Sequence, residues 1–309
     1  MASKLFTYFG NKEHVAKRIW ELFGQTDSFV EAFCGCASVL LACPSDIKHR
    51  WECLNDFDCH IANVFRSVKY HPEAVVEAAY GPRTEVDLHT RHDWLITHAE
   101  ALRQHILSDP KACDPELAGW WIWGINLWIG GGWCSEAALK WKQKPGHRNQ
   151  GLLTARKKPE LGSNGTRGIF HGRGDRRAII EAMVQAVSDR LIDVTICYGD
   201  FERVLTPSYT TQFGTCAVLL DPPYKGDKTY AQDVKGTWAR AQDWFLAHYQ
   251  DPQFRIILCG NSHDWPDPPD DVRVYKYNRT MAGMDHSNAE EALWISKHCV
   301  DESRLDWAL

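Results

Sequence analysis

The sequence predicts an α/β fold with a mostly parallel sheet. Short apolar runs that are typical of strands occur at residues 28–33, 49–55, 194–199, 216–221, 254–260, 272–278 and 291–296. Helical stretches separate several of these runs, and strands that alternate with helices favour parallel pairing. The second and third runs are far apart in the chain. We therefore expect a sheet in two parts, residues 1–80 and 190–309, with residues 81–189 inserted as a helical and basic domain.

The composition is that of an ordinary globular protein. The chain has 309 residues, of which 44% are hydrophobic and 24% charged, enough for one large or two smaller domains. Eleven cysteines include no CxxC pair, and the N-terminus does not resemble a signal peptide, so we expect reduced thiols in a cytoplasmic protein. Neither zinc-site spacing nor an apolar run of about 20 residues occurs, which argues against a metal site and a membrane helix.

Positive charge is concentrated in one part of the chain. The formal net charge is −5, yet residues 140–177 hold eleven Lys or Arg against two acids, Glu160 and Asp175. Such a run is either a solvated face or a surface that contacts phosphates, and we favour the second. The candidate DNA-binding residues are Lys140, Lys142, Arg148, Lys157, Lys158, Arg173, Arg176 and Arg177.

Acidic residues follow several of the expected strands. Asp56 follows the second run, Asp200 follows the third, and Asp221 is the last residue of the fourth. After the first run, Gly35 begins a tight turn into a helix. A turn glycine or a helix-capping Asp is common by itself. Because ligands of open α/β sheets bind beyond the carboxyl ends of the strands, the combination predicts a binding site at that edge.

The fourth run ends in the tetrapeptide DPPY, residues 221–224. Two prolines fix an extended backbone, so the Asp221 carboxylate and the Pro222 carbonyl can accept hydrogen bonds from one planar amino group. Tyr224 can stack on the ring that bears this amine. The pattern predicts a site for the exocyclic amine of a nucleobase; the alternative is a rigid turn in which the tyrosine only packs.

These motifs resemble those of the Dam-like DNA adenine-N6 methyltransferases, which use S-adenosylmethionine. The similar segments are Tyr8 to Lys12 (YFGNK), Glu31 to Ser38 (EAFCGCAS), Asp56-Phe57, Asp200-Phe201, the DPPY tetrapeptide and the strand EALWIS at 291–296. Ala32, Ala37 and Asn11 depart from the family pattern. The order of the motifs is that of the alpha group, and the resemblance spans about residues 5–297.

The resemblance implies a Rossmann-like class I methyltransferase sheet with a target-recognition insertion. It also implies an enzyme that transfers a methyl group to N6 of a flipped-out adenine in double-stranded DNA. No metal is required. The implied catalytic residues are Asp221, Pro222, Pro223 and Tyr224. The implied cofactor-binding residues are Tyr8, Gly10, Lys12, Glu31, Phe33, Gly35, Asp56, Phe57, Asp200 and Phe201. The implied host is a bacterial or phage-infected cell; the target sequence, the oligomeric state and membership of a restriction-modification system stay open.

Other readings remain at this point. The acceptor could be adenine in RNA, the cytosine amine or a glutamine side chain, although relatives acting on the last two tend to carry Ser or Asn where this chain has Asp221. A non-catalytic DNA-binding protein of the same fold is a further alternative. The tryptophan-rich stretch at residues 119–133 indicates core packing, or else one of its tryptophans or Asn126 contacts the flipped base.

Overall fold

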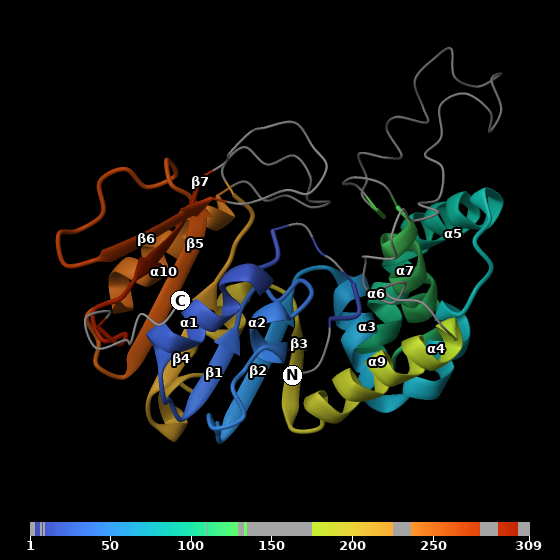
Figure 1. Ribbon diagram of the computed structural model, residues 1–309, viewed down its shortest axis with the longest axis horizontal. Coiled ribbons are helices and arrows are strands. Elements are labelled where there is room, and N and C mark those ends of the chain that lie inside the picture. The colour runs from blue at the N-terminus through green and yellow to red at the C-terminus, as the bar shows by residue number, and fades with distance from the viewer. Residues whose placement is uncertain are drawn as a thin grey trace, which may run out of the picture.

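A seven-stranded sheet forms the centre of the computed structural model, which describes residues 4–6, 8, 10–109, 111–128, 133–134, 175–224, 236–278 and 290–301 (Figure 1). The strands are β1 (Ser28–Glu31), β2 (Trp51–Asp56), β3 (Val194–Tyr198), β4 (Cys216–Leu220), β5 (Phe254–Asn261), β6 (Arg273–Asn278) and β7 (Glu290–Ile295). Each lies in or overlaps one of the predicted apolar runs. The predicted α/β class is therefore confirmed, and β1 and β2 lie more than 130 residues before β3 in the sequence.

The strand order is β3-β2-β1-β4-β5-β7-β6. Strands β1 to β5 pair in parallel, and β7 runs antiparallel between β5 and β6. Strand β1 lies between β2 and β4, so the order reverses at its carboxyl end. In sheets of this kind, the crevice at such a reversal is where ligands bind.

Helices cover both faces of the sheet. Core residues of α1 (Ala16–Phe23), α2 (Ser38–Leu41), α3 (Cys59–Tyr70) and α9 (Arg176–Leu191) share one cluster with one face of the strands. On the other face, α10 (Thr237–His248) packs with the alternate strand residues, as do residues of the 3₁₀ helix η4 (Phe201–Val204). Because both faces are covered, β1 and β4 are buried throughout, which explains their continuous apolar runs. The edge strand β6 alternates between partly buried and exposed residues.

The remaining helices gather beside the β3 edge, on the right of Figure 1. They are α4 (Pro72–Ala79), α5 (Glu85–Thr97), α6 (Ala99–Ser108) and α7 (Pro115–Leu127); two short 3₁₀ helices, η1 (Glu13–Val15) and η5 (Thr211–Phe213), complete the elements described here. Residues of α4, α7 and α9 belong to the same core cluster as the sheet. Helix α9 also packs against α3 and α4 from the first part of the chain. The predicted domain boundaries at residues 80 and 189 thus stay a prediction.

The tryptophan-rich stretch packs the core, as one of its two interpretations predicts. Trp121 and Trp123 of α7 are buried, and Gly119 lets α7 approach α4 so closely that an added Cβ would lie 2.4 Å from Ala78 Cβ. Asn126 donates hydrogen bonds to the carbonyls of Leu5 (3.1 Å) and Ile122 (2.8 Å). Its amide therefore anchors the N-terminal segment to α7.

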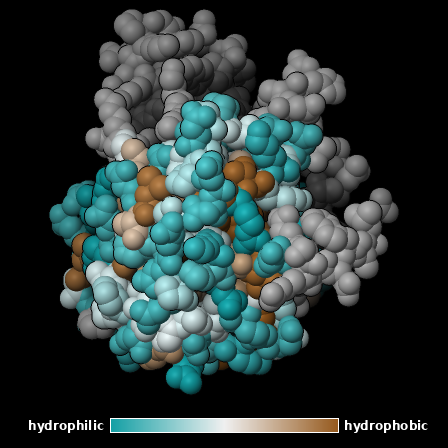
Figure 2. Space-filling view, turned by 90° about the vertical axis from the view of Figure 1, so that its left-hand side faces the viewer, coloured by the Kyte–Doolittle hydropathy of each residue, from teal (hydrophilic) through white to brown (hydrophobic). Residues whose placement is uncertain are grey.

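Figure 2 shows the side of the molecule that lies on the left in Figure 1. The described residues on this face are mainly hydrophilic, and the apolar ones form small, separate patches. Over the described part of the chain, no helix has the length and apolar character needed to cross a membrane.

Candidate active site

A cavity of about 440 Å³ opens at the carboxyl ends of β1, β2, β3 and β4. Its lining includes the ten residues that the sequence predicts to bind a cofactor: Tyr8, Gly10, Lys12, Glu31, Phe33, Gly35, Asp56, Phe57, Asp200 and Phe201. Asp221 and Pro223 of the DPPY segment line the same cavity. The parallel sheet has thus brought together motifs that lie up to about 200 residues apart in the chain.

The turn after β1 is held in left-handed backbone. Gly35 has a φ of +48°, and a Cβ added there would lie 2.9 Å from Cδ1 of Tyr8. Ala37, which stands where the family pattern has a second glycine, also has a positive φ of 52°. The strain of a non-glycine residue in this conformation costs about 1–2 kcal/mol. This departure from the family pattern therefore keeps the backbone shape that the glycine would favour.

Two carboxylates, the buried Glu31 and the partly buried Asp56, hold this turn. Glu31 at the end of β1 accepts a hydrogen bond from the Leu40 amide of α2 (3.1 Å), and burial raises its pKa to about 8. Asp56 accepts hydrogen bonds from the amides of Gly35 (2.9 Å) and Asp58 (2.9 Å). Burial raises the pKa of Asp56 to about 6. The next residue, Phe57, leaves 51% of its surface exposed beside the cavity.

The end of the cavity beyond β3 contains a residue that the sequence analysis missed, Arg240 of α10. Its guanidinium forms a two-pronged ion pair with Asp200, with N–O distances of 3.0 and 2.9 Å. It also lies 5.0 Å from the centre of the Phe201 ring, and Phe201 in turn contacts Phe33. Burial alone would raise the pKa of Asp200, but its hydrogen bonds with Arg240 lower it. Asp200 is thus an ionised carboxylate, and Arg240 occupies part of its capacity to accept hydrogen bonds.

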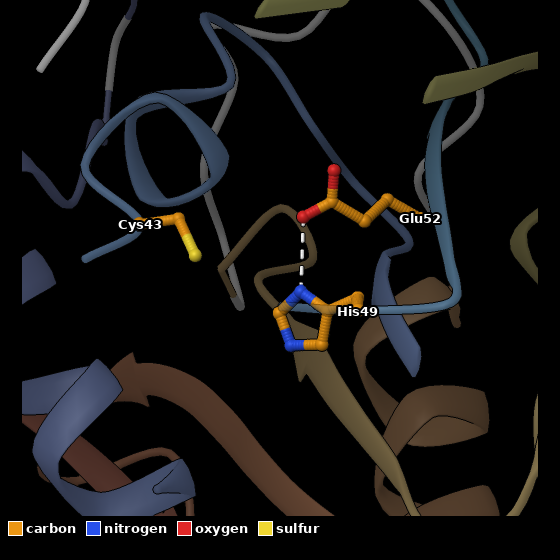
Figure 3. A group of neighbouring side chains, drawn as sticks. All are labelled: Cys43, His49 and Glu52. Carbon is orange, nitrogen blue, oxygen red and sulfur yellow. Dashed lines mark hydrogen bonds and ion pairs between the residues drawn. The ribbon is translucent and has the colours of Figure 1, made fainter. Parts of the chain in front are cut away.

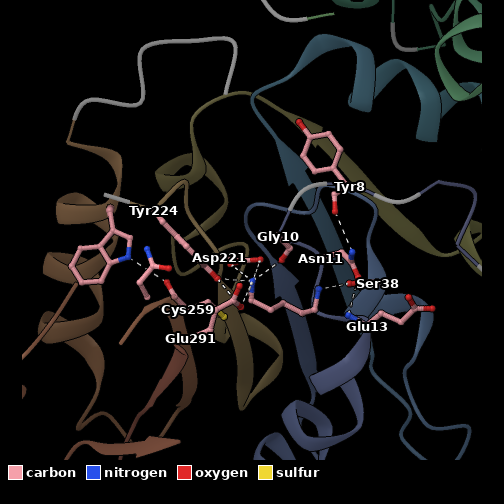
Figure 4. A network of polar contacts seen from close by, with 12 residues as sticks. Tyr8, Gly10, Asn11, Glu13, Ser38, Asp221, Tyr224, Cys259 and Glu291 are labelled. Carbon is pink, nitrogen blue, oxygen red and sulfur yellow. Dashed lines mark hydrogen bonds and ion pairs between the residues drawn. The ribbon is translucent and has the colours of Figure 1, made fainter. Parts of the chain in front are cut away.

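Lys12 links Gly10 of the N-terminal segment to Asp221 and Tyr224 of the DPPY segment, and Figure 4 labels these three partners. Its side chain is only 1% exposed, and its Nζ donates hydrogen bonds to the Gly10 carbonyl (2.7 Å), the Asp221 carboxylate (2.8 Å) and the Tyr224 hydroxyl (2.8 Å). Burial alone would lower the pKa of Lys12, but nearby acidic groups, Asp221 above all, raise it. Burial raises the pKa of Asp221 even though Lys12 opposes this. The buried ammonium of Lys12 is therefore hydrogen-bonded to two of the predicted catalytic residues, Asp221 and Tyr224.

The last strands of the sheet add residues that no sequence motif identified as functional. Glu291 of β7 accepts hydrogen bonds from the hydroxyls of Tyr277 (2.7 Å) and Tyr224 (3.3 Å). Its carboxylate lies 3.9 Å from Lys12 Nζ. In the sequence, residues 291–296 are only a strand that resembles the family, so the contact of Glu291 with the predicted catalytic segment is seen only in the structure.

The predicted DNA-binding residues Lys140, Lys142, Arg148, Lys157, Lys158 and Arg173 lie outside the described residues. Arg176 and Arg177 stand in the first turn of α9. Arg176 donates a hydrogen bond to the Gly81 carbonyl (2.9 Å), and Arg177 forms an ion pair with Glu77. Both guanidinium groups also lie over the Tyr80 ring. These contacts attach α9 to the end of α4, while a role in DNA binding stays a prediction.

Two groups of potential metal ligands occur in the described part of the chain, Cys43–His49–Glu52 and Asp58–Cys59–His60. In the first (Figure 3), His49 Nδ1 lies 2.9 Å from Glu52, and Arg190 of α9 pairs with the same carboxylate at 2.6 and 2.7 Å. Burial raises the pKa of the Cys43 thiol to about 11. A guanidinium that already neutralises the carboxylate disfavours a cation, so we interpret this group as the ion pair that holds α9 on β2.

In the second group, the Asp58 carboxylate already accepts a hydrogen bond from the backbone. It caps α3 by accepting a hydrogen bond from the His60 amide (2.8 Å). Burial lowers the pKa of His60 to about 4 and raises that of Cys59 to about 12. These residues fix the start of α3 at the cavity wall.

Comparison with known proteins agrees with this geometry. Residues 8–106, about a third of the chain, match the family model of the D12 class N6 adenine-specific DNA methyltransferases. A search of curated proteins found no match. The matched region holds the turn after β1, the acid that ends β2 and Lys12, and DPPY follows at the end of β4. This match agrees with the resemblance noted in the sequence: residues 8–106 are similar to the D12 class N6 adenine-specific DNA methyltransferases.

Proposed function

We propose that the cavity binds S-adenosylmethionine and that Asp221 directs its methyl group to the N6 of a flipped-out adenine in double-stranded DNA. The observation that carries the proposal is that Asp221 and the ten predicted cofactor residues line one cavity. Its volume of about 440 Å³ lies within the usual range of small-molecule sites. When bound, the cofactor supplies a methyl group on a positively charged sulfur.

The donor and acceptor groups suit this cofactor. Asp56 can accept hydrogen bonds from the ribose hydroxyls, and Phe57, Phe201 or Tyr8 can cover the adenine ring. Asp200 uses three acceptor positions for Arg240 and the Glu202 amide, out of about four that a carboxylate offers. One position therefore remains for the amine of the cofactor's adenine.

The chain's own residues would activate the target amine by positioning it. Its lone pair is delocalised into the base, so the nitrogen is a poor nucleophile. Hydrogen bonds from its two protons to the Asp221 carboxylate and the Pro222 carbonyl would favour a pyramidal nitrogen and aim the lone pair at the methyl group. Tyr224 would stack on the base. Most of the rate enhancement would then come from orientation and electrostatics.

Cofactor binding is tested by calorimetry with S-adenosylmethionine. We expect wild type to bind, and Phe57→Ala to lose about 1–3 kcal/mol of binding free energy, the usual worth of stacking a base on an aromatic ring. Tyr70→Ala is the matched control, because Tyr70 is 45% exposed on α3 and lies outside the cavity lining. Equal affinities of the three proteins would show that Phe57 does not cover the cofactor, and absence of binding by wild type would contradict the proposed site.

The basic segment is tested by its salt dependence. We propose that Lys140, Lys142, Arg148, Lys157, Lys158 and Arg173 contact the phosphates of duplex DNA. Replacing Lys157, Lys158 and Arg173 by glutamine should weaken binding about equally for any sequence and lower the slope of log affinity against log salt by about 0.9 per lost contact. Arg176 and Arg177 are left intact because they hold α9. An unchanged slope would indicate a solvated face.

A further inference from the structure

We propose that Glu291 is a positioning residue for methyl transfer: it shares the charge of Lys12, so that Asp221 remains a strong acceptor for the target amine. This inference rests on the proposed function of Asp221. It adds a residue of β7, which lies at the other end of the chain from Lys12.

The contacts place Glu291 behind the catalytic segment, not in front of it. Glu291 is 2% exposed, and it is absent from the cavity lining, whereas Asp221 is part of that lining. Its Oε2 atom accepts hydrogen bonds from the hydroxyls of Tyr277 and Tyr224 and lies 3.9 Å from Lys12 Nζ. Glu291 therefore acts on the target through Lys12 and Tyr224.

Lys12 has three protons, and all are directed at named acceptors. They point to the Gly10 carbonyl, to Asp221 and to the Tyr224 hydroxyl. If Asp221 were the sole counter-charge of this ammonium, the pair would be close to neutral and the carboxylate would be a weak acceptor for another group. With Glu291 present, one cation is shared by two carboxylates, and Asp221 keeps negative charge for the amine.

The charge balance of the cluster favours the reaction. Glu31, which also faces Asp221, is uncharged below about pH 8 because burial raises its pKa. Lys12, Asp221 and Glu291 then bring two carboxyl groups and one ammonium together. Methyl transfer brings positive charge onto the amine nitrogen, and a preorganised negative site stabilises that charge.

Asp221 is surrounded by titratable groups from every element packed against it. These groups are Lys12 before η1, Glu31 on β1, Tyr224 after β4, Cys259 on β5, Tyr277 on β6 and Glu291 on β7. The Glu291 charge contributes to raising the pKa of Asp221. Removing this charge should therefore lower the pH at which Asp221 ionises.

The test is the Glu291→Gln variant, whose side chain keeps the shape and an acceptor oxygen for the two tyrosines. We expect kcat on unmethylated genomic DNA to fall about 10- to 100-fold, as for other residues that orient a catalytic group. Cofactor affinity should stay unchanged, and the acid limb of the kcat–pH profile should move to lower pH. Glu290→Gln is the control, because Glu290 is exposed and pairs with Lys276 on β6.

A Glu291→Gln enzyme with wild-type kcat and an unmoved acid limb would overturn the inference. Should this variant fail to fold, Glu291→Asp carries the test, since its shorter side chain moves the carboxylate away from Lys12. An acid limb of the kcat–pH profile at lower pH than in wild type then supports the inference, and an acid limb at the wild-type position contradicts it. Wild type is assayed first: if it does not methylate DNA, the proposed function fails, whereas a difference confined to Glu291 variants concerns only this inference.

Discussion

Replacing Asp221 by asparagine should reduce methyl transfer to DNA by about 10²- to 10⁴-fold, the usual contribution of a positioned acid–base group. Asparagine has nearly the same shape, but its oxygen carries no full negative charge and its NH₂ group cannot accept a hydrogen bond. The loss should therefore appear in the single-turnover rate constant of methyl transfer. Calorimetry should show that cofactor affinity changes little, because Asp221 acts on the target amine.

The matched control is Asp243→Asn, which removes an exposed carboxylate from α10. It should methylate DNA at the wild-type rate. Near-normal turnover of Asp221→Asn would exclude Asp221 as the acceptor for the amine. A selective loss of cofactor affinity with normal single-turnover chemistry would instead move Asp221 from the target side of the cavity to the cofactor side.

Lys12→Met should destabilise the folded protein by about 3–5 kcal/mol, because breaking a buried ion pair leaves an uncompensated charge. Without the ammonium, the partly buried Asp221 and the buried Glu291 are two carboxylates that have lost the cation near both of them. The folded-state pKa of at least one of them must then rise above its unfolded value. Stability of the variant is therefore greatest at acidic pH and is lost as the pH rises through the folded pKa.

This prediction is checked by urea unfolding of wild type and Lys12→Met at pH 5 and pH 8. The difference in the free energy of unfolding should be larger at pH 8. Lys17→Met is the control, since the Lys17 side chain is 87% exposed and pairs only loosely with Glu21 at 3.9 Å. Equal stability of wild type and Lys12→Met at both pH values would show that the cluster does not depend on the ammonium.

The sheet and the lining of the cavity could be predicted because their signals are local. The buried strands β1 and β4 appear as continuous apolar runs, and the acids stand directly after runs that pair in parallel. Since parallel strands share one carboxyl edge, Glu31, Asp56, Asp200 and Asp221 had to approach one another. The positions of Gly35 and Phe57 follow from the same local motifs.

The contacts between distant segments could not be predicted in this way. Lys12 and Asp221 are 209 positions apart, and the motif that contains Lys12 predicts a cofactor-binding residue but not this contact. Glu291 looks like the first residue of an ordinary strand until β6 and β7 place it against Tyr224. Arg240 lies on a helix without a motif, yet it pairs with Asp200. Composition alone also gave no sign that Arg176 and Arg177 contact α4.

Methylation of adenine at N6 is tested most directly by identifying the methylated base. The wild-type protein is incubated with unmethylated duplex DNA and S-adenosylmethionine that carries a deuterated methyl group, and the DNA is then digested to nucleosides and analysed by mass spectrometry. Single-stranded DNA and transcript RNA are assayed in parallel. We expect deuterated N6-methyldeoxyadenosine from duplex DNA with the wild-type protein and none with Asp221→Asn. A label found on cytosine, label transfer to RNA alone, or unlabelled DNA would contradict this expectation.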